Sequence, residues 1–159
     1  MTAYAFSFKG LDERDIRLSA FAGKPILVVN TASHCGYTPQ YAGLQELWTR
    51  YRDRGLAVIG VPSNDFGGQE PGGAIEIGKT ALQDYKVSFP VAGQATVKGR
   101  DAHPFYRWAA DARPLEAPRW NFHKYLIGRD GLLKAAFVSA VSPTDPRVIA
   151  AIELELAAG

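Results

Sequence analysis

The sequence is poor in cysteine, because Cys35 is the only one among 159 residues. An intrachain disulfide is therefore excluded at any stage of a reaction cycle. Any chemistry that oxidises the Cys35 sulfur must be reversed by a partner molecule.

Long apolar runs and an excess of one charge are also absent. Eighteen Lys and Arg residues face sixteen Asp and Glu residues, which leaves a formal net charge of +2. The two signs are interspersed, so the sequence predicts no nucleic-acid partner. No apolar run approaches the length that spans a membrane, and residues 1–10 lack the pattern of a secretory signal. We expect a soluble, cytoplasmic protein without stable membrane insertion.

What the sequence does contain is an apolar content of 47%, enough for a packed core. A chain of this length buries roughly two-thirds of its unfolded surface, and no linker or repeat interrupts it. We therefore expect one domain over residues 1–159.

The central prediction is a strand, a helix and a second strand. Residues 26–29 are apolar without alternation, as in a strand that is covered on both faces. Residues 39–54 place apolar side chains at helical spacing, with Pro39 at the first position and Gly55 as the stop. Residues 56–61 predict a second buried strand, parallel to the first.

The rest of the chain predicts an α/β sandwich in which a central mixed sheet is flanked by helices. Asp130-Gly131 marks the turn of a late hairpin, and Asp145-Pro146 opens a final helix. The other predicted elements are an N-terminal β-hairpin (4–8 and 16–18), helices 74–85 and 104–110, and extended pieces 87–90 and 95–97.

Cys35 lies where the first buried strand leads into the helix. A lone cysteine is more often a small buried hydrophobe than a nucleophile. Here, however, the free N–H groups at the helix start favour a thiolate over a thiol. Residues 35–38 have the frame of a CxxC motif with threonine at the second position, which excludes dithiol exchange. His34 is adjacent, but neighbouring side chains on an extended stretch point in opposite directions.

Residues 73–80 match the phosphate-loop pattern GxxxxGK[ST]. Such a loop directly follows a buried strand, whereas Gly73 follows Glu70-Pro71-Gly72 well beyond the strand end. An ordinary surface helix is the better interpretation.

Three neutral side chains could assist Cys35. Gln69 lies in a glycine-rich loop after the second strand, and Trp120 and Asn121 precede the late hairpin. Amide and indole N–H groups donate to an anion without titrating. A packed indole and an ordinary turn asparagine are the alternative, and spacing alone does not decide between them.

Three motifs, at residues 30–38, 64–72 and 120–125, resemble those of the glutathione peroxidases. The resemblance runs from about residue 6 to residue 156. It implies a thioredoxin-like fold in a single peroxidase domain. It also implies that Cys35 is the peroxidatic residue and that Gln69, Trp120 and Asn121 are its catalytic partners. No metal and no bound cofactor are implied, since glutathione or another thiol serves as co-substrate.

Departures from the family pattern bear on the reductant and the assembly. Ser63 stands where many members have cysteine, and Asp65 where glutamine is common, which puts a possible negative charge near the site. Ala81 occupies the position of the resolving cysteine of the thioredoxin-using branch. The chain also lacks the insertion that forms subunit contacts in tetrameric members, so the resemblance implies a monomer.

We therefore expect an antioxidant enzyme of the oxidative-stress response. It would reduce hydrogen peroxide or organic and lipid hydroperoxides through a Cys35 sulfenic acid, which a small thiol or a thioredoxin-like reductant then reduces. Two alternatives stay open. Cys35 is a redox sensor or relay that passes oxidation to a partner, or the chain is a degenerate, non-catalytic binding module.

Overall fold

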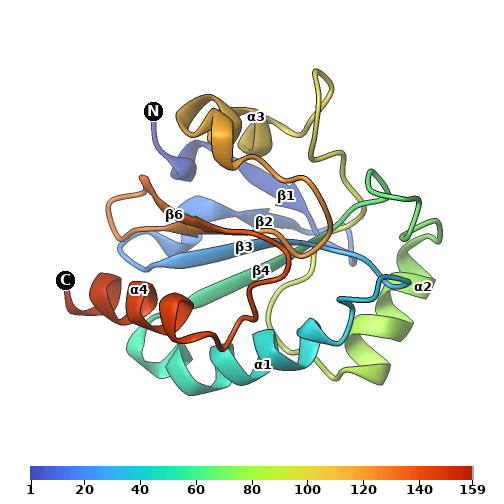
Figure 1. Ribbon diagram of the computed structural model, residues 1–159, viewed down its shortest axis with the longest axis horizontal. Coiled ribbons are helices and arrows are strands. Elements are labelled where there is room, and N and C mark those ends of the chain that lie inside the picture. The colour runs from blue at the N-terminus through green and yellow to red at the C-terminus, as the bar shows by residue number, and fades with distance from the viewer. Residues whose placement is uncertain (159) are drawn as a thin grey trace.

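The computed structural model describes residues 1–158, and its centre is a mixed sheet with the strand order β4-β3-β5-β6 (Figure 1). The strands are β3 (Ile26–Thr31), β4 (Ala57–Pro62), β5 (Lys124–Ile127) and β6 (Leu133–Phe137). Strand β3 pairs parallel with β4 and antiparallel with β5, and β5 pairs antiparallel with β6. The two predicted buried strands and the late hairpin are confirmed.

Helices and a small hairpin cover the two faces of the sheet. Helices α1 (Gln40–Tyr51) and α4 (Pro146–Ala157) lie on one face (Figure 1). Helix α3 (Pro104–Ala112) and the antiparallel hairpin of β1 (Ser7–Lys9) and β2 (Asp15–Arg17) lie on the other. Successive side chains of a strand point to opposite faces. Leu27 and Val29 accordingly join the core under α1 and α4, and Ile26 and Val28 join the core under α3.

Helix α1 follows its predicted bounds closely. Pro39 is its N-cap, and after Tyr51 the chain continues as a 3₁₀ turn, η3 (Arg52–Arg54). Gly55 ends this turn with φ +115°, a left-handed conformation that glycine adopts without strain. The helix begins at the carboxyl end of β3, which places the Cys35 loop directly before it.

The predicted helix 74–85 is correct in position but not in geometry. Helix α2 (Ala74–Gly78) begins after Gly73 and passes into a π-helical turn, η4 (Lys79–Asp84). Its wider winding is seen in the bond from the Tyr85 N–H to the Thr80 carbonyl, 3.0 Å. Such turns occur often at functional sites. The segment that matches the phosphate-loop pattern is thus part of this helical stretch.

The two predicted extended pieces, 87–90 and 95–97, do not form strands. Just after the first piece the chain forms two isolated bridges, one between Val91 and Gly60 of β4 and one between Ala92 and Gly10, which follows β1. Pro90 accepts a hydrogen bond from Gly60 but has no N–H to donate, so the ladder does not extend.

Side chains cap the two remaining helices. His103 accepts from the Phe105 N–H at the start of α3, and Asp145 accepts from the Arg147 N–H at the start of α4. The Asp145-Pro146 start predicted from sequence is confirmed. Further 3₁₀ turns are η1 (Ala3–Ala5), η2 (Leu18–Phe21) and η5 (Pro114–Glu116). Among residues 1–158, no helix has the length and apolar character needed to cross a membrane.

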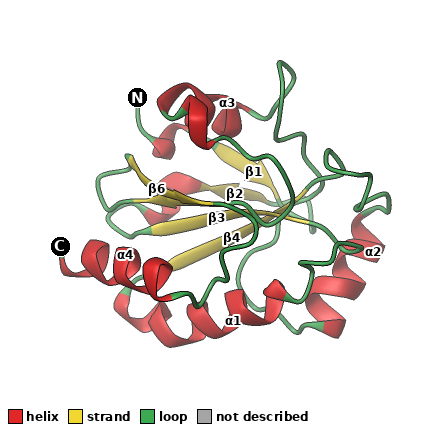
Figure 2. Cartoon of the chain, viewed as in Figure 1, coloured by secondary structure: helices red, strands yellow, loops and turns green. Residues whose placement is uncertain are grey.

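The loops that leave β3 and β4 emerge at the same end of the sheet, beside α2 (Figure 2). Carboxyl ends of parallel strands are where open α/β sheets bind ligands. Cys35 follows β3 and Gln69 follows β4, so the topology brings the first two motifs together.

Candidate active site

The Cys35 loop is a tight turn fastened by Thr38. The Thr38 hydroxyl accepts from the Cys35 N–H at 3.0 Å and donates to the Ala32 carbonyl at 2.8 Å. Cys35 is only 8% exposed, and its Sγ accepts a hydrogen bond from the Tyr37 N–H at 3.3 Å. The sulfur is thus held in a buried turn with one backbone donor directed at it.

This donor differs from the one that the sequence predicts. We expected the N–H groups at the first turn of the helix, but the donor is Tyr37, in the turn before α1 begins. Thr38 and Tyr37 were not singled out as functional residues. The signal was present, because a threonine just ahead of a helix is a common source of side-chain to backbone hydrogen bonds.

Gln69 connects the other two motifs to the Cys35 loop. Its backbone carbonyl accepts from the His34 N–H at 3.0 Å, next to Cys35. Its side-chain oxygen accepts from the Asn121 Nδ2 at 3.0 Å. Asn121 is fully buried and also donates to the Phe66 carbonyl at 3.4 Å. Because the Gln69 oxygen accepts from Asn121, the NH₂ group is the donor that this side chain still offers.

Trp120 lies against the same loop. Its ring is 6.1 Å from the Phe66 ring, and a Cβ at Gly67 would come within 2.8 Å of it. Gly67 also has φ +70°, so both the backbone and the indole require glycine there. The Asn30 side chain donates to the Trp120 carbonyl at 3.1 Å, which ties this segment to β3. Trp120 keeps 37% of its surface exposed.

The backbone between Trp120 and β5 is strained. Phe122 has φ +63°, a conformation that costs a non-glycine residue about 1 kcal/mol. Two contacts stabilise this conformation. The Phe122 N–H donates to the Asn30 carbonyl, and the centroid of the Phe122 ring lies 5.4 Å from that of the Tyr41 ring. Such strained positions cluster at functional sites. Here the turn directs Asn121 inward, toward Gln69.

Two of the three predicted partners, Gln69 and Asn121, therefore meet each other, and Trp120 packs against Phe66 of the same loop. Within residues 1–158, no hydrogen bond joins the side chain of Gln69, Trp120 or Asn121 to the Cys35 Sγ. Gln69 and Asn121 bond to each other, and Gln69 reaches the Cys35 loop through its backbone. Their catalytic roles stay predictions.

Cys35 opens to a cavity of about 490 Å³ between its loop and the α2–η4 segment. This volume is within the usual range of small-molecule sites. The His34 Nε2 lies 2.5 Å from the Glu76 Oε1 across this cavity. The complete lining is Ser33, His34, Cys35, Thr38, Pro39, Glu76, Lys79, Thr80, Asp84 and Tyr85.

Two departures from the family pattern have structural explanations. The Asp65 carboxylate accepts from the backbone N–H groups of Val97, at 2.6 Å, and Lys98, at 3.2 Å. Its charge is thus engaged in fixing that turn and does not face the cavity around Cys35. Ala81, at the position of the resolving cysteine, is fully buried in η4.

A buried lysine holds the surrounding segments together. The Lys124 Nζ donates to the carbonyls of Ser139, at 3.1 Å, and Val141, at 2.5 Å. Gln40, at the start of α1, donates to the same Ser139 carbonyl at 2.8 Å. Burial lowers the pKa of Lys124 to about 7. The segment after β6 thereby links β5, next to Asn121, with the helix that follows Cys35.

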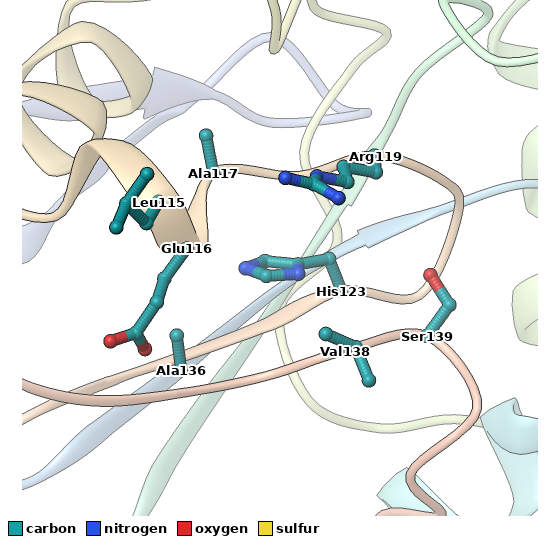
Figure 3. A pocket seen from close by; sticks show the side chains of 8 residues that line it. All are labelled: Leu115, Glu116, Ala117, Arg119, His123, Ala136, Val138 and Ser139. Atoms are coloured by element: carbon teal, nitrogen blue, oxygen red, sulfur yellow. The ribbon is translucent and has the colours of Figure 1, made fainter.

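A second pocket lies apart from Cys35, against the edge strand β6 (Figure 3). The ring of His123 points into it beside Glu116 and Arg119. His123 is 3% exposed, and its Nε2 has no hydrogen-bond partner within residues 1–158. Burial lowers the pKa of His123 to about 4, so the ring is neutral near pH 7.

His123 should make the folded state sensitive to mild acid. Below pH 6.5 the unfolded chain protonates this ring while the folded chain does not, so the free energy of unfolding should fall as the pH drops toward 4. The total loss should be about 3 kcal/mol. Urea unfolding at pH 7 and pH 4.5 measures it, and His123→Gln should flatten the dependence. If the variant keeps the full pH dependence, His123 is not its source.

Across the part of the chain that the structure describes, no cluster of three His, Cys, Asp or Glu side chains could hold a metal ion. Besides the Cys35 thiol, the site contains the Tyr37 backbone donor, the amides of Gln69 and Asn121, and the charged and polar side chains that line the cavity.

Comparison with known proteins identifies related chains. A family model described as glutathione peroxidase matches residues 3–110, which include Cys35 and Gln69. The chain is 42% identical over 153 residues to the hydroperoxy fatty acid reductase gpx1 of Synechocystis sp., covering 91% of this chain and 90% of that protein. It is 40% identical over 143 residues to the glutathione peroxidase-like peroxiredoxin GPX5 of Chlamydomonas reinhardtii, with 88% of each chain covered.

Comparison with solved structures identifies related folds. The apo form of Trgpx superposes with a TM-score of 0.79 at 33% identity, covering 99% of this chain and 97% of that one. T. cruzi GPX1 superposes with a TM-score of 0.78 at 27% identity, with the same coverage. A thioredoxin family protein from Chlorobium tepidum, at 16% identity and a TM-score of 0.71 over 98% and 96% of the two chains, shares the fold. With its thioredoxin-like fold, its thiol at the end of β3 and these relatives, the chain belongs to the glutathione peroxidase family.

Proposed function

We propose that this peroxidase uses Cys35 to reduce hydrogen peroxide and organic or lipid hydroperoxides. The observation that carries the proposal is the junction at Gln69, whose backbone bonds to the Cys35 loop and whose side chain bonds to Asn121. It brings a thiol and neutral donors from three separate motifs to one end of the sheet. The name of the Synechocystis relative, a hydroperoxy fatty acid reductase, supports lipid hydroperoxides among the substrates.

The proposed first step is nucleophilic. The Cys35 thiolate attacks the distal oxygen of the hydroperoxide, the O–O bond breaks, and a sulfenic acid forms on sulfur. The Tyr37 N–H stabilises the thiolate before attack. The Gln69 NH₂ and the Trp120 indole N–H are the donors that we assign to the peroxide oxygens.

The proposed second half of the cycle uses an external thiol, because no other cysteine exists in the chain. The thiol forms a mixed disulfide with Cys35, and a second thiol releases it. Charges of both signs line the cavity, with Lys79 against Glu76 and Asp84, and the His34 ring lies beside Glu76. This lining suits a small zwitterionic thiol such as glutathione, and a thioredoxin-like protein is the second candidate.

The test is peroxide consumption with each reductant in turn. We expect turnover of an alkyl hydroperoxide with millimolar glutathione, and the same assay with thioredoxin and its reductase ranks the two reductants. Stoichiometric oxidation of Cys35 without turnover by either reductant would contradict a peroxidase cycle and favour a redox sensor.

We also propose that the enzyme acts as a monomer in the cytoplasm. A reducing compartment supplies thiols and keeps a lone cysteine reduced. The short connection between α3 and Trp120 supports the monomeric state by resemblance to family members without the subunit-contact insertion.

A further inference from the structure

His34 pairs with Glu76 across the cavity beside Cys35. The His34 Nε2 lies 2.5 Å from the Glu76 Oε1, and the two side chains are 52% and 41% exposed. The contact joins the Cys35 loop to α2. A carboxylate only accepts hydrogen bonds, so the proton of this contact sits on Nε2. Nδ1 is then the ring nitrogen that takes up and releases a second proton.

The His34 ring and the Cys35 sulfur open onto the same cavity, which differs from the expectation for an extended stretch. The chain bends at residues 33–35, so the two neighbouring side chains do not point to opposite sides, and both line the cavity. Their backbones are also fixed. The His34 N–H donates to the Gln69 carbonyl at 3.0 Å, and the Cys35 N–H donates to the Thr38 hydroxyl at 3.0 Å.

The reaction needs an acid that the neutral donors do not supply. When a thiolate attacks an alkyl hydroperoxide, the leaving group is an alkoxide, which is a strong base. Gln69, Trp120 and Asn121 donate hydrogen bonds but do not give up protons near neutral pH. A positioned general acid is worth about 10²–10⁴ in rate, and it works best when it exchanges protons near the working pH. Histidine has this property, whereas lysine side chains are in general much weaker acids.

We propose that His34 is the general acid for the leaving oxygen and that Glu76 is its positioning residue. Glu76 keeps the proton on Nε2 and holds the ring at the cavity, so Nδ1 serves the reaction. The inference rests on the proposed peroxidase function and adds a proton donor to it. The other charged groups that face the pair are Glu70 behind the loop, and Lys79 and Asp84 in the cavity wall.

Atoms and protons balance within this step. The Cys35 thiol gives its proton to the His34 Nδ1, and the thiolate then attacks the distal oxygen of the peroxide. The S–O bond forms as the O–O bond breaks, so the sulfur is oxidised and the peroxide is reduced. The alkoxide takes the proton from Nδ1. A thiol and a hydroperoxide thus become a sulfenic acid and an alcohol, and the His34 ring is neutral again.

The dependence on the leaving group tests the proposal. In single-turnover measurements at pH 7, His34→Ala should reduce tert-butyl hydroperoxide about a hundredfold more slowly than the wild type, and added free imidazole should restore much of this rate. With peracetic acid, whose carboxylate leaving group needs no proton, the loss should be smaller by about tenfold or more. Glu76→Gln should show a weaker loss of the same selectivity, and Glu46→Gln, at an exposed site on α1, should show none.

The two peroxides separate proton delivery from bracing of the loop. Equal losses with both peroxides in the His34 and Glu76 variants would show that the pair only supports the loop, and would overturn the proposal. An unchanged rate of His34→Ala with tert-butyl hydroperoxide would overturn it as well. So would a selective loss in Lys79→Met of the size expected for His34→Ala, because Lys79 would then be the acid. If the wild type reduces neither peroxide, the proposed function itself is wrong.

Discussion

Replacing Cys35 by serine should abolish peroxide turnover. Serine keeps the size and the turn geometry, but a hydroxyl is not ionised near neutral pH and does not form a sulfenic acid. We expect a rate with alkyl hydroperoxide and thiol that equals the rate without enzyme. Coupled peroxide consumption measures the rate, and circular dichroism confirms that the variant is folded.

A relocated thiol provides the matched control. The double variant Cys35→Ser, Ser19→Cys carries the same number of cysteines, but its thiol is exposed on η2, which precedes the start of β3, whereas the Cys35 loop follows its end. It should be as inactive as Cys35→Ser if the turn around Thr38 and Tyr37 activates the sulfur. Substantial turnover by either variant would refute the assignment of Cys35.

Changing Asn121 to aspartate should have the second largest effect. The isosteric carboxylate replaces the donor to Gln69 Oε1 with an acceptor, so Gln69 loses its orientation. It also adds a buried negative charge that opposes the thiolate and the developing negative charge on the leaving oxygen. We expect the second-order rate constant with hydroperoxide to fall about a hundredfold, the usual cost of losing such a donor. The acid limb of the pH–rate profile should move to higher pH.

Asn121→Ala separates the two contributions. It removes the donor without adding a charge, so its loss should be smaller and its pH profile should stay close to that of the wild type. If Asn121→Asp reduces peroxide as fast as the wild type, the contact between Asn121 and Gln69 has no catalytic role. Rapid-mixing kinetics over the range pH 5 to pH 9 measure all three proteins alike.

The sequence and the cavity around Cys35 both favour an external thiol as the reductant. One cysteine excludes an internal disulfide, and the buried Ala81 in η4 shows that the segment which carries a resolving cysteine elsewhere in the family packs here as ordinary core. The π-helical turn contributes Lys79, Thr80 and Asp84 to the lining of the cavity beside Cys35. In this chain the segment is therefore a wall of the site and supplies no thiol.

Helices and strands could be predicted from the sequence wherever the local pattern is strong. Strands β3 and β4 are apolar on both faces, α1 repeats buried side chains every three to four residues, and Asp130-Gly131 marks the turn of the late hairpin. The errors lie where local sequence is ambiguous. The chain around Val91 pairs only briefly with Gly60, because Pro90 has no N–H to extend the ladder, and η4 winds as a π-helix where the pattern predicts an ordinary helix.

By itself, the sequence determined the chemistry: a single thiol at a strand-to-helix junction, three motifs in family order and no second cysteine. These follow from residue identity, which needs no coordinates. Only the tertiary structure decided which groups meet. It assigned the sulfur's hydrogen bond to Tyr37, joined Asn121 to Gln69, and turned Asp65 to another loop. Contacts between segments distant in sequence depend on strand register and on the strained turn at Phe122, which no local pattern encodes.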